Sequence, residues 1–210
     1  MIHNISGRFD KRWQEALNEF NKVMDLDQKD VEVYYSRQNI FCDLDNWDQE
    51  IEDCDRAIKL NPKNADAYSK RGKVYYMLGN DHKAIADYDK AIKLSPKFTE
   101  AYLRRGDTYR SLGDYDKAMA DYDKAIEFDQ KDAEAYYSRA VAFDKLGKHK
   151  PAIADINKAI KFNPKHAMSY YVRGVIFGKM CNYDEAIADL DKAFDLDQQD
   201  ATTFHEDGKT

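Results

Sequence analysis

Residues 112–126 read LGDYDKAMADYDKAI, and related stretches recur along the chain at a fixed step. Thirty-four residues earlier, residues 78–92 read LGNDHKAIADYDKAI. Thirty-four residues later, residues 146–160 read LGKHKPAIADINKAI, and one further step gives MCNYDEAIADLDKAF over residues 180–194. A repeat of this period predicts a solenoid, in which similar supersecondary units stack on one another and bury a continuous core.

The period divides the chain into a regular middle and two incomplete ends. Five full periods run without a gap over residues 31–200: 31–64, 65–98, 99–132, 133–166 and 167–200. Residues 1–30 are predicted to be a degenerate or partial N-terminal repeat, because Trp13 and Phe20 keep the pattern of its second half. Residues 201–210 are predicted to be the truncated start of a further repeat, or a tail.

Each period contains two apolar stripes at helical spacing, separated by a break. In three copies the first break holds a glycine, which accepts the left-handed conformation that closes a helix: Gly79, Gly113 and Gly147. The second break holds a proline, which cannot continue the preceding helix: Pro62, Pro96 and Pro164. The sequence therefore predicts an all-α fold, an α-solenoid of antiparallel helix hairpins.

Tyrosine and phenylalanine recur at two positions of the first helix, with a small residue between them. The second helix carries alanines, so its backbone can approach the first helix closely. Because the aromatic residues follow the repeat, we interpret them as core residues rather than as a ligand site.

Every full period also carries an arginine in its first helix and an aspartate sixteen residues later. Both positions lie on the packed sides of facing helices, so we predict a ladder of partly buried ion pairs. Each pair joins residues within one hairpin or reaches the hairpin before it. The ladder consists of Arg37, Asp53, Arg71, Asp87, Arg105, Asp121, Arg139, Asp155, Arg173 and Asp189.

Composition and motifs exclude several functions. The net charge of −6 argues against a general nucleic-acid binder. The apolar runs are too short for membrane insertion, and the N-terminus lacks the features of a signal peptide, so we expect a cytoplasmic protein. The five histidines share no repeat position, and no set of residues has metal-ligand or catalytic spacing. We therefore expect no enzyme activity, no metal and no cofactor.

The repeat resembles the tetratricopeptide repeat, whose pattern of aromatic, small, glycine, alanine and proline residues also spans 34 residues. In the second period the matching residues are Tyr68, Gly72, Tyr75, Gly79, Ala84, Ala91 and Pro96. The ladder arginines depart from this pattern, since many members have an aliphatic residue there. The resemblance implies a right-handed superhelix whose first helices line a concave groove for a partner protein or peptide. Carried over to this sequence, the groove comprises Tyr35, Asn39, Ser69, Lys70, Lys73, Tyr76, Arg104, Asp107, Arg110, Tyr137, Val141 and Tyr171.

Two questions stay open at the level of sequence. Lys70, Lys73 and Arg104 form either a patch for an acidic peptide or ordinary solvated surface. The chain is either an adaptor that binds a peptide in its groove, an assembly element that self-associates through its terminal repeats, or a regulatory array of a longer protein. Gln38 and Glu50 occupy positions that hold small residues in other repeats, and we expect them to hydrogen-bond each other or to contact a ligand.

Overall fold

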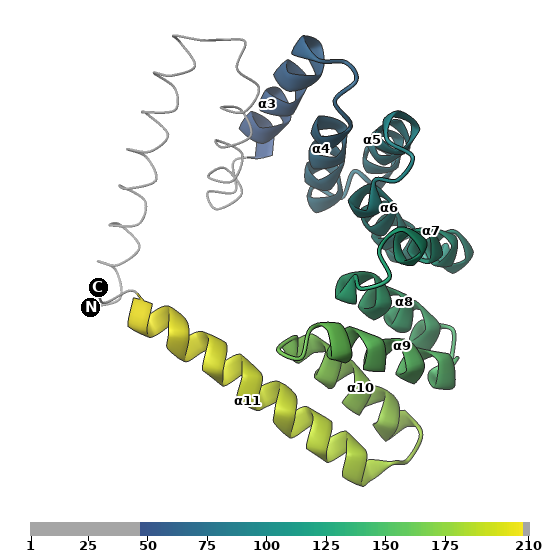
Figure 1. The fold of residues 1–210 in the computed structure, drawn as a ribbon, viewed down its shortest axis with the longest axis vertical. Helices are drawn as coiled ribbons and strands as arrows, with labels where there is room; N and C mark the ends of the chain where they lie inside the picture. The colour runs from purple at the N-terminus through teal and green to yellow at the C-terminus, as the bar shows by residue number, and fades with distance from the viewer. Residues whose placement is uncertain (1–46, 208–210) are drawn as a thin grey trace. The chain divides into compact units, whose positions relative to one another are not determined.

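The computed structural model describes the backbone of residues 47–207 and the side chains of residues 47–199 (Figure 1). Within this part of the chain every regular element is a helix. The described residues form two compact units, residues 47–96 and residues 97–207. The helices are α3 (Trp47–Leu60), α4 (Ala65–Met77), α5 (Asp81–Leu94), α6 (Thr99–Ser111), α7 (Tyr115–Phe128), α8 (Ala133–Lys145), α9 (His149–Phe162), α10 (Ala167–Lys179) and α11 (Tyr183–Asp207). The described chain is therefore an all-α repeat solenoid, as predicted.

In the first unit, α3 packs against α4, and α4 forms a hairpin with α5. Helix α4 begins where the Asn64 side chain accepts a hydrogen bond from the backbone N–H of Ala67, at 3.1 Å. A Cβ atom added at its Gly72 would lie 3.2 Å from the backbone oxygen of the fully buried Ala84 of α5. Small side chains at the contact let the two helix axes approach each other closely.

In the second unit, α6 pairs with α7, α8 with α9, and α10 with α11. The core joins successive hairpins, because Leu103 of α6 and Tyr122 of α7 share one buried cluster with Ala135 and Ala142 of α8. Each hairpin thus completes its neighbour's core, which is the stacking that the period predicts.

The turn inside each hairpin has the left-handed backbone that the sequence predicts. Gly79, Gly113 and Gly147 have φ values of 71°, 79° and 70°. The α10–α11 turn uses Cys181 at φ 62°, where a side chain is present. A left-handed residue other than glycine costs roughly 1–2 kcal/mol, so this turn is the least favourable of the four.

Helix α11 differs from the predicted pattern. The repeat predicts a boundary at residue 200, where a further period would begin, but α11 runs without interruption from Tyr183 to Asp207. Residues 201–207 extend this helix instead of beginning another one. The break position holds Gln198, which unlike proline allows a helix to continue, although α7 ends at Phe128 with Gln130 in the same position.

The aromatic core also differs in detail. The tyrosines that are fully buried are Tyr88 and Tyr122, both on second helices, at 1% and 0% exposure. Of the repeated tyrosines of the first helices, Tyr68, Tyr102 and Tyr170 are half-buried, whereas Tyr136 is buried at 6% exposure. Their rings lie beside the ladder arginines, with the Arg71 guanidinium carbon 5.6 Å from the centre of the Tyr68 ring. These tyrosines therefore cover charged groups as well as apolar ones.

Candidate interaction surface

Four of the predicted arginine–aspartate pairs lie in the described residues, and each is bidentate within its hairpin. Nε and Nη2 of the arginine donate to the two oxygens of the aspartate sixteen residues later. The two distances are 2.7 and 2.6 Å for Arg71–Asp87, 2.8 and 2.6 Å for Arg105–Asp121, 2.6 and 2.8 Å for Arg139–Asp155, and 2.7 and 2.7 Å for Arg173–Asp189. All four carboxylates are buried. Arg37, which would pair with Asp53, lies outside the described residues.

The remaining nitrogen of the arginine can reach the preceding hairpin. Nη1 of Arg139 donates to Asp123 of α7 at 2.6 Å, and Nη1 of Arg71 donates to Asp55 of α3. The pKa of Arg71 is raised, because its hydrogen bonds to Asp87 outweigh the opposing effect of burial. Arg71 and Arg139 therefore each join three helices and remain charged, so their role is structural.

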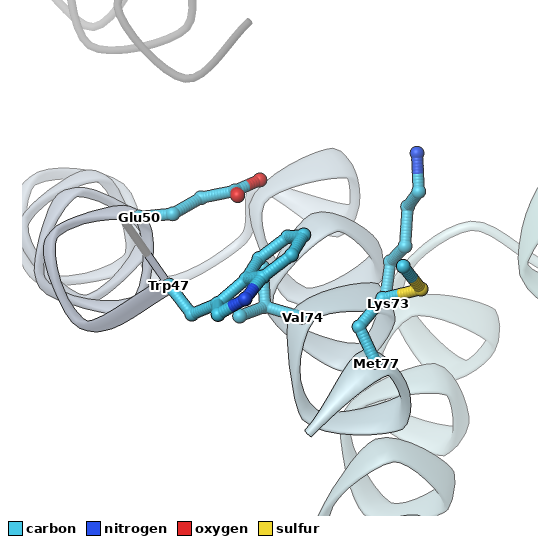
Figure 2. Close-up of a pocket in the computed structure, with 5 residues that line it drawn as sticks. All are labelled: Trp47, Glu50, Lys73, Val74 and Met77. Atoms are coloured by element: carbon cyan, nitrogen blue, oxygen red, sulfur yellow. The ribbon is translucent and has the colours of Figure 1, made fainter. Parts of the chain in front are cut away.

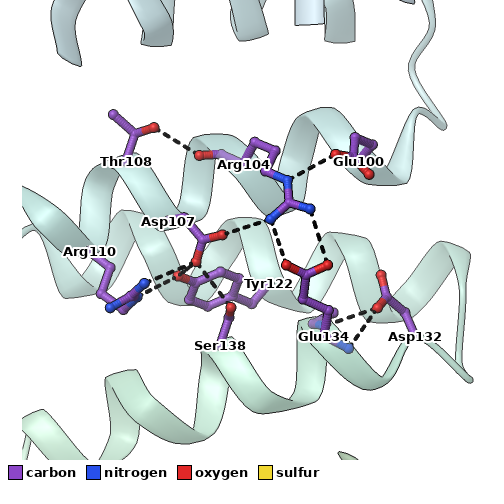
Figure 3. Close-up of polar contacts among 10 residues, drawn as sticks. Glu100, Arg104, Asp107, Thr108, Arg110, Tyr122, Asp132, Glu134 and Ser138 are labelled. Atoms are coloured by element: carbon purple, nitrogen blue, oxygen red, sulfur yellow. Dashed lines mark hydrogen bonds and ion pairs between the residues drawn. The ribbon is translucent and has the colours of Figure 1, made fainter. Parts of the chain in front are cut away.

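A second polar network, without counterpart in the repeat pattern, connects α6, α7 and α8 (Figure 3). Its centre is Asp107, which is buried. Oδ1 of Asp107 accepts hydrogen bonds from the Tyr122 hydroxyl at 2.9 Å, from the Ser138 hydroxyl at 3.0 Å and from Nη2 of Arg110 at 3.3 Å. Three helices thus hold one carboxylate in a single orientation.

Arg104 is held at the edge of this network by carboxylates from two helices (Figure 3). Its Nε donates to Glu100 at 2.9 Å, and Nη1 and Nη2 donate to Glu134 at 2.6 and 3.1 Å. Nη1 also lies 3.6 Å from Oδ2 of Asp107. Burial opposes the charge of Arg104, but the hydrogen bonds to Glu134 and Glu100 outweigh burial and raise its pKa. Arg104 is therefore a paired cation.

Arg110 is less tightly held. Its Nε donates to the Tyr122 hydroxyl at 3.2 Å, and its Nη2 bond to Asp107 is also long. The side chain is 30% exposed. Arg110 therefore offers an anchored guanidinium from which water or a ligand can accept a further hydrogen bond.

Aromatic and apolar residues continue this face onto α8 and α10. The half-buried ring of Tyr137 packs edge-on against His166, with ring centres 5.0 Å apart. Burial raises the pKa of Tyr137, and the charge of Arg110 acts in the opposite direction. Val141 is half-buried, and Tyr171 is 49% exposed.

The other predicted groove residues lie on α4, in the first unit. Ser69 is buried, Tyr76 is half-buried, and Lys73 is exposed. Lys70 lies 3.2 Å from Asp66. The predicted basic patch is thus divided between the two units, and Lys70 and Arg104 each have a carboxylate partner. Tyr35 and Asn39 lie outside the described residues.

A small pocket lies between α3 and α4 (Figure 2). It has a volume of about 180 Å³ and is lined by Trp47 and Glu50 of α3 and by Lys73, Val74 and Met77 of α4. Glu50 is only 4% exposed. Gln38, its predicted partner, lies outside the described residues, so the expected hydrogen bond stays a prediction.

Sequence reasoning missed Tyr122 and Ser138 as partners of Asp107. One signal was available: the repeat position of Asp107 holds Asn39, Lys73, Val141 and Val175 in the other periods. A carboxylate that occurs once in a repeated position is a candidate for a contact of its own.

Among the described residues, the histidine, cysteine, aspartate and glutamate side chains form no group suited to a metal ion. None of the described helices combines the length and apolarity needed to cross a membrane.

Comparisons with known families agree with one another along most of the chain. Models described as "TPR repeat" match residues 39–79 and 106–147. Models described as "Tetratricopeptide repeat" match residues 65–98, 133–166, 87–120 and 167–200. No curated protein sequence matches the chain.

Solved structures show the same fold. MamA is 25% identical with a TM-score of 0.67, and the match covers 79% of this chain and 96% of MamA. A tetratricopeptide repeat protein from Parabacteroides merdae is 25% identical with a TM-score of 0.72, covering 90% of this chain and 74% of its own. Yeast Tom70 is 25% identical with a TM-score of 0.74, covering 93% of this chain and 43% of its own.

Proposed function

Because the chain belongs to the tetratricopeptide repeat family, whose repeats are protein-interaction modules, we propose that it is a non-catalytic scaffold that binds a partner peptide. The peptide lies across the first helices of the second unit, α6, α8 and α10. The observation that carries this proposal is the Asp107 network, in which Asp107 and the Tyr122 hydroxyl accept from Arg110 while its side chain stays 30% exposed. Preorganised side chains lose little entropy when a ligand binds.

The chemistry of this face favours a particular kind of segment. Arg104 is already satisfied by Glu100 and Glu134, so an acidic ligand would compete with both carboxylates there. Arg110 has only long hydrogen bonds and is the better anchor for a carboxylate or a backbone carbonyl. Tyr137 and Tyr171 provide aromatic surface for an apolar side chain. The proposed ligand is therefore a peptide that pairs one acidic or carbonyl group with a neighbouring apolar residue.

The proposal is tested by selecting peptides from a random display library on the purified protein. The affinity of a selected peptide is then measured for the wild type and for Arg110→Gln, Tyr171→Ala and Lys150→Ala. Lys150 is exposed on α9, a second helix, and serves as the control. We expect Tyr171→Ala and Arg110→Gln each to weaken binding roughly tenfold, the loss typical of a hot-spot residue, and Lys150→Ala to have no effect.

Helical circular dichroism must first be equal in all four proteins. Selected peptides that bind all four with equal affinity, or a library that yields no binder, would contradict this assignment of the surface.

A further inference from the structure

Helix α11 exposes a stripe of large apolar side chains that the proposed peptide site does not use. Tyr183, Ile187, Leu190 and Phe194 are 63%, 58%, 38% and 65% exposed. They are spaced by four, three and four residues, so they share one face of the helix. A contiguous exposed apolar face of this kind indicates an interaction site.

The same positions of α7 show how such a face is covered. Tyr115, Met119 and Ile126 are partly buried and Tyr122 is fully buried in the cluster that includes Ala135 and Ala142 of α8. The two alanines are seven residues apart, so they lie on one side of α8. Helix α8 therefore covers the large side chains of α7 with small ones.

An ion pair accompanies this contact. Arg139 lies between the two alanines in sequence, and its Nη1 donates to Asp123 of α7 at 2.6 Å. Arg71 of α4 reaches Asp55 of α3 in the same way, and Arg173 of α10 reaches Asn157 of α9 at 2.6 Å. A second helix thus offers an acceptor for the arginine of the helix that covers it.

Asp191 is the equivalent acceptor on α11, and it is exposed. Helix α11 is the last helix of the described chain, so no later described helix supplies an arginine to Asp191. Asp184 and Asp195 are seven and four residues from Asp191 and lie along the same edge of the apolar stripe. The stripe therefore has an acidic border.

We propose that this face of α11 binds a helix of a partner protein that carries a small residue, an arginine four positions later, and a small or apolar residue three positions after that. This is the pattern of Ala135, Arg139 and Ala142. The arginine binds Asp191, and the small residues pack on Ile187 and Leu190. A second copy of α11 does not fit this surface, because its acidic border would face Asp184, Asp191 and Asp195 with like charge.

The experiment uses the protein of residues 1–210 and a stapled, fluorescently labelled peptide of residues 132–148, which contains α8. A matched peptide carries Arg139→Gln. Binding is followed by fluorescence anisotropy for the wild-type protein and for Asp191→Asn, Phe194→Ser and Glu185→Gln. Glu185 is exposed on the side of α11 opposite the apolar stripe and serves as the control.

We expect the wild-type peptide to bind the wild-type protein. Asp191→Asn in the protein and Arg139→Gln in the peptide should each weaken binding roughly tenfold, and the two changes together should cost little more than either alone. Phe194→Ser should also weaken binding at least about tenfold, and Glu185→Gln should leave it unchanged. This pattern would identify the arginine–Asp191 contact directly.

Three results would overturn the proposal. The first is a wild-type peptide that does not bind. The second is equal binding to wild type and Asp191→Asn, which would place the peptide elsewhere. The third is a wild-type dimer in sedimentation velocity that Phe194→Ser dissociates, which would make a second copy of this chain the occupant.

Discussion

The stabilising effect of the ladder can be tested at Arg139. Its guanidinium contacts the buried carboxylate of Asp155, which is 4% exposed, and the exposed carboxylate of Asp123. Replacing Arg139 by methionine keeps the aliphatic stem and leaves Asp155 as a buried charge without its partner. Removing one member of a buried pair costs about 3–5 kcal/mol. Because the Arg139 side chain is 17% exposed, water can reach the site, and we expect about 3 kcal/mol.

The matched control uses the other end of the same guanidinium. The Asp123 side chain is 61% exposed, so Asp123→Asn should lower the free energy of unfolding by less than about 1 kcal/mol. The double variant Arg139→Met with Asp155→Leu removes both buried charges and should lie within about 1 kcal/mol of the wild type. All variants are compared by urea unfolding followed by helical circular dichroism.

The reasoning would be refuted by either of two results. Equal losses for Arg139→Met and Asp123→Asn would mean that burial does not distinguish the two contacts. A double variant less stable than Arg139→Met would mean that the buried charge of Asp155 is not the source of the loss.

Two further predictions concern the second unit. A Cβ atom added at Gly106 would lie 2.7 Å from Cε1 of Tyr122, whose hydroxyl donates a hydrogen bond to Asp107. Gly106→Ala should therefore lower the free energy of unfolding in urea by about 1–3 kcal/mol. A Cβ atom added at Gly178 meets nothing within 4 Å, so Gly178→Ala should be neutral or stabilising. Equal effects of the two changes would contradict the close approach of α6 and α7. Burial, and then the charge of Asp107, raise the pKa of Tyr122 above its ordinary value of 10.0, so the folded state keeps this proton after the unfolded chain has lost it. The contribution of Tyr122 to the free energy of unfolding is complete below about pH 10 and declines as the pH rises further. Tyr122→Phe should therefore reduce the fall of Tm between roughly pH 9.5 and 11.5. An equal fall of Tm in the wild type and in Tyr122→Phe would contradict the raised pKa of Tyr122.

Much of the fold could be predicted because the same pattern of residues recurs in every period. The glycine at the first break and the proline at the second are local signals that act within a few residues. The sixteen-residue spacing of arginine and aspartate is also periodic, so the hairpin geometry that pairs Arg71 with Asp87 also pairs Arg139 with Asp155. The periodicity did not decide whether each arginine bonds within its own hairpin, to the preceding hairpin, or to both.

Features that occur once could not be predicted in this way. The length of α11 depends on Gln198 standing where proline ends other helices, and a glutamine permits either outcome. The state of Arg104 depends on Glu134, which lies thirty residues away on another helix. A sequence that shows a basic residue on a helix face does not show whether a carboxylate already neutralises it.

The sequence by itself determined the period, the hairpins and the positions that repeat, because these depend on local conformational preferences and on a pattern present five times. Only the tertiary structure decided which polar side chains meet at the candidate surface. Asp107, Tyr122 and Ser138 come from three helices, and their contact requires those helices to pack at one distance and rotation. Only the packed structure, too, showed that the apolar stripe of α11 is exposed while the equivalent stripe of α7 is covered, because burial depends on which helix packs against each face.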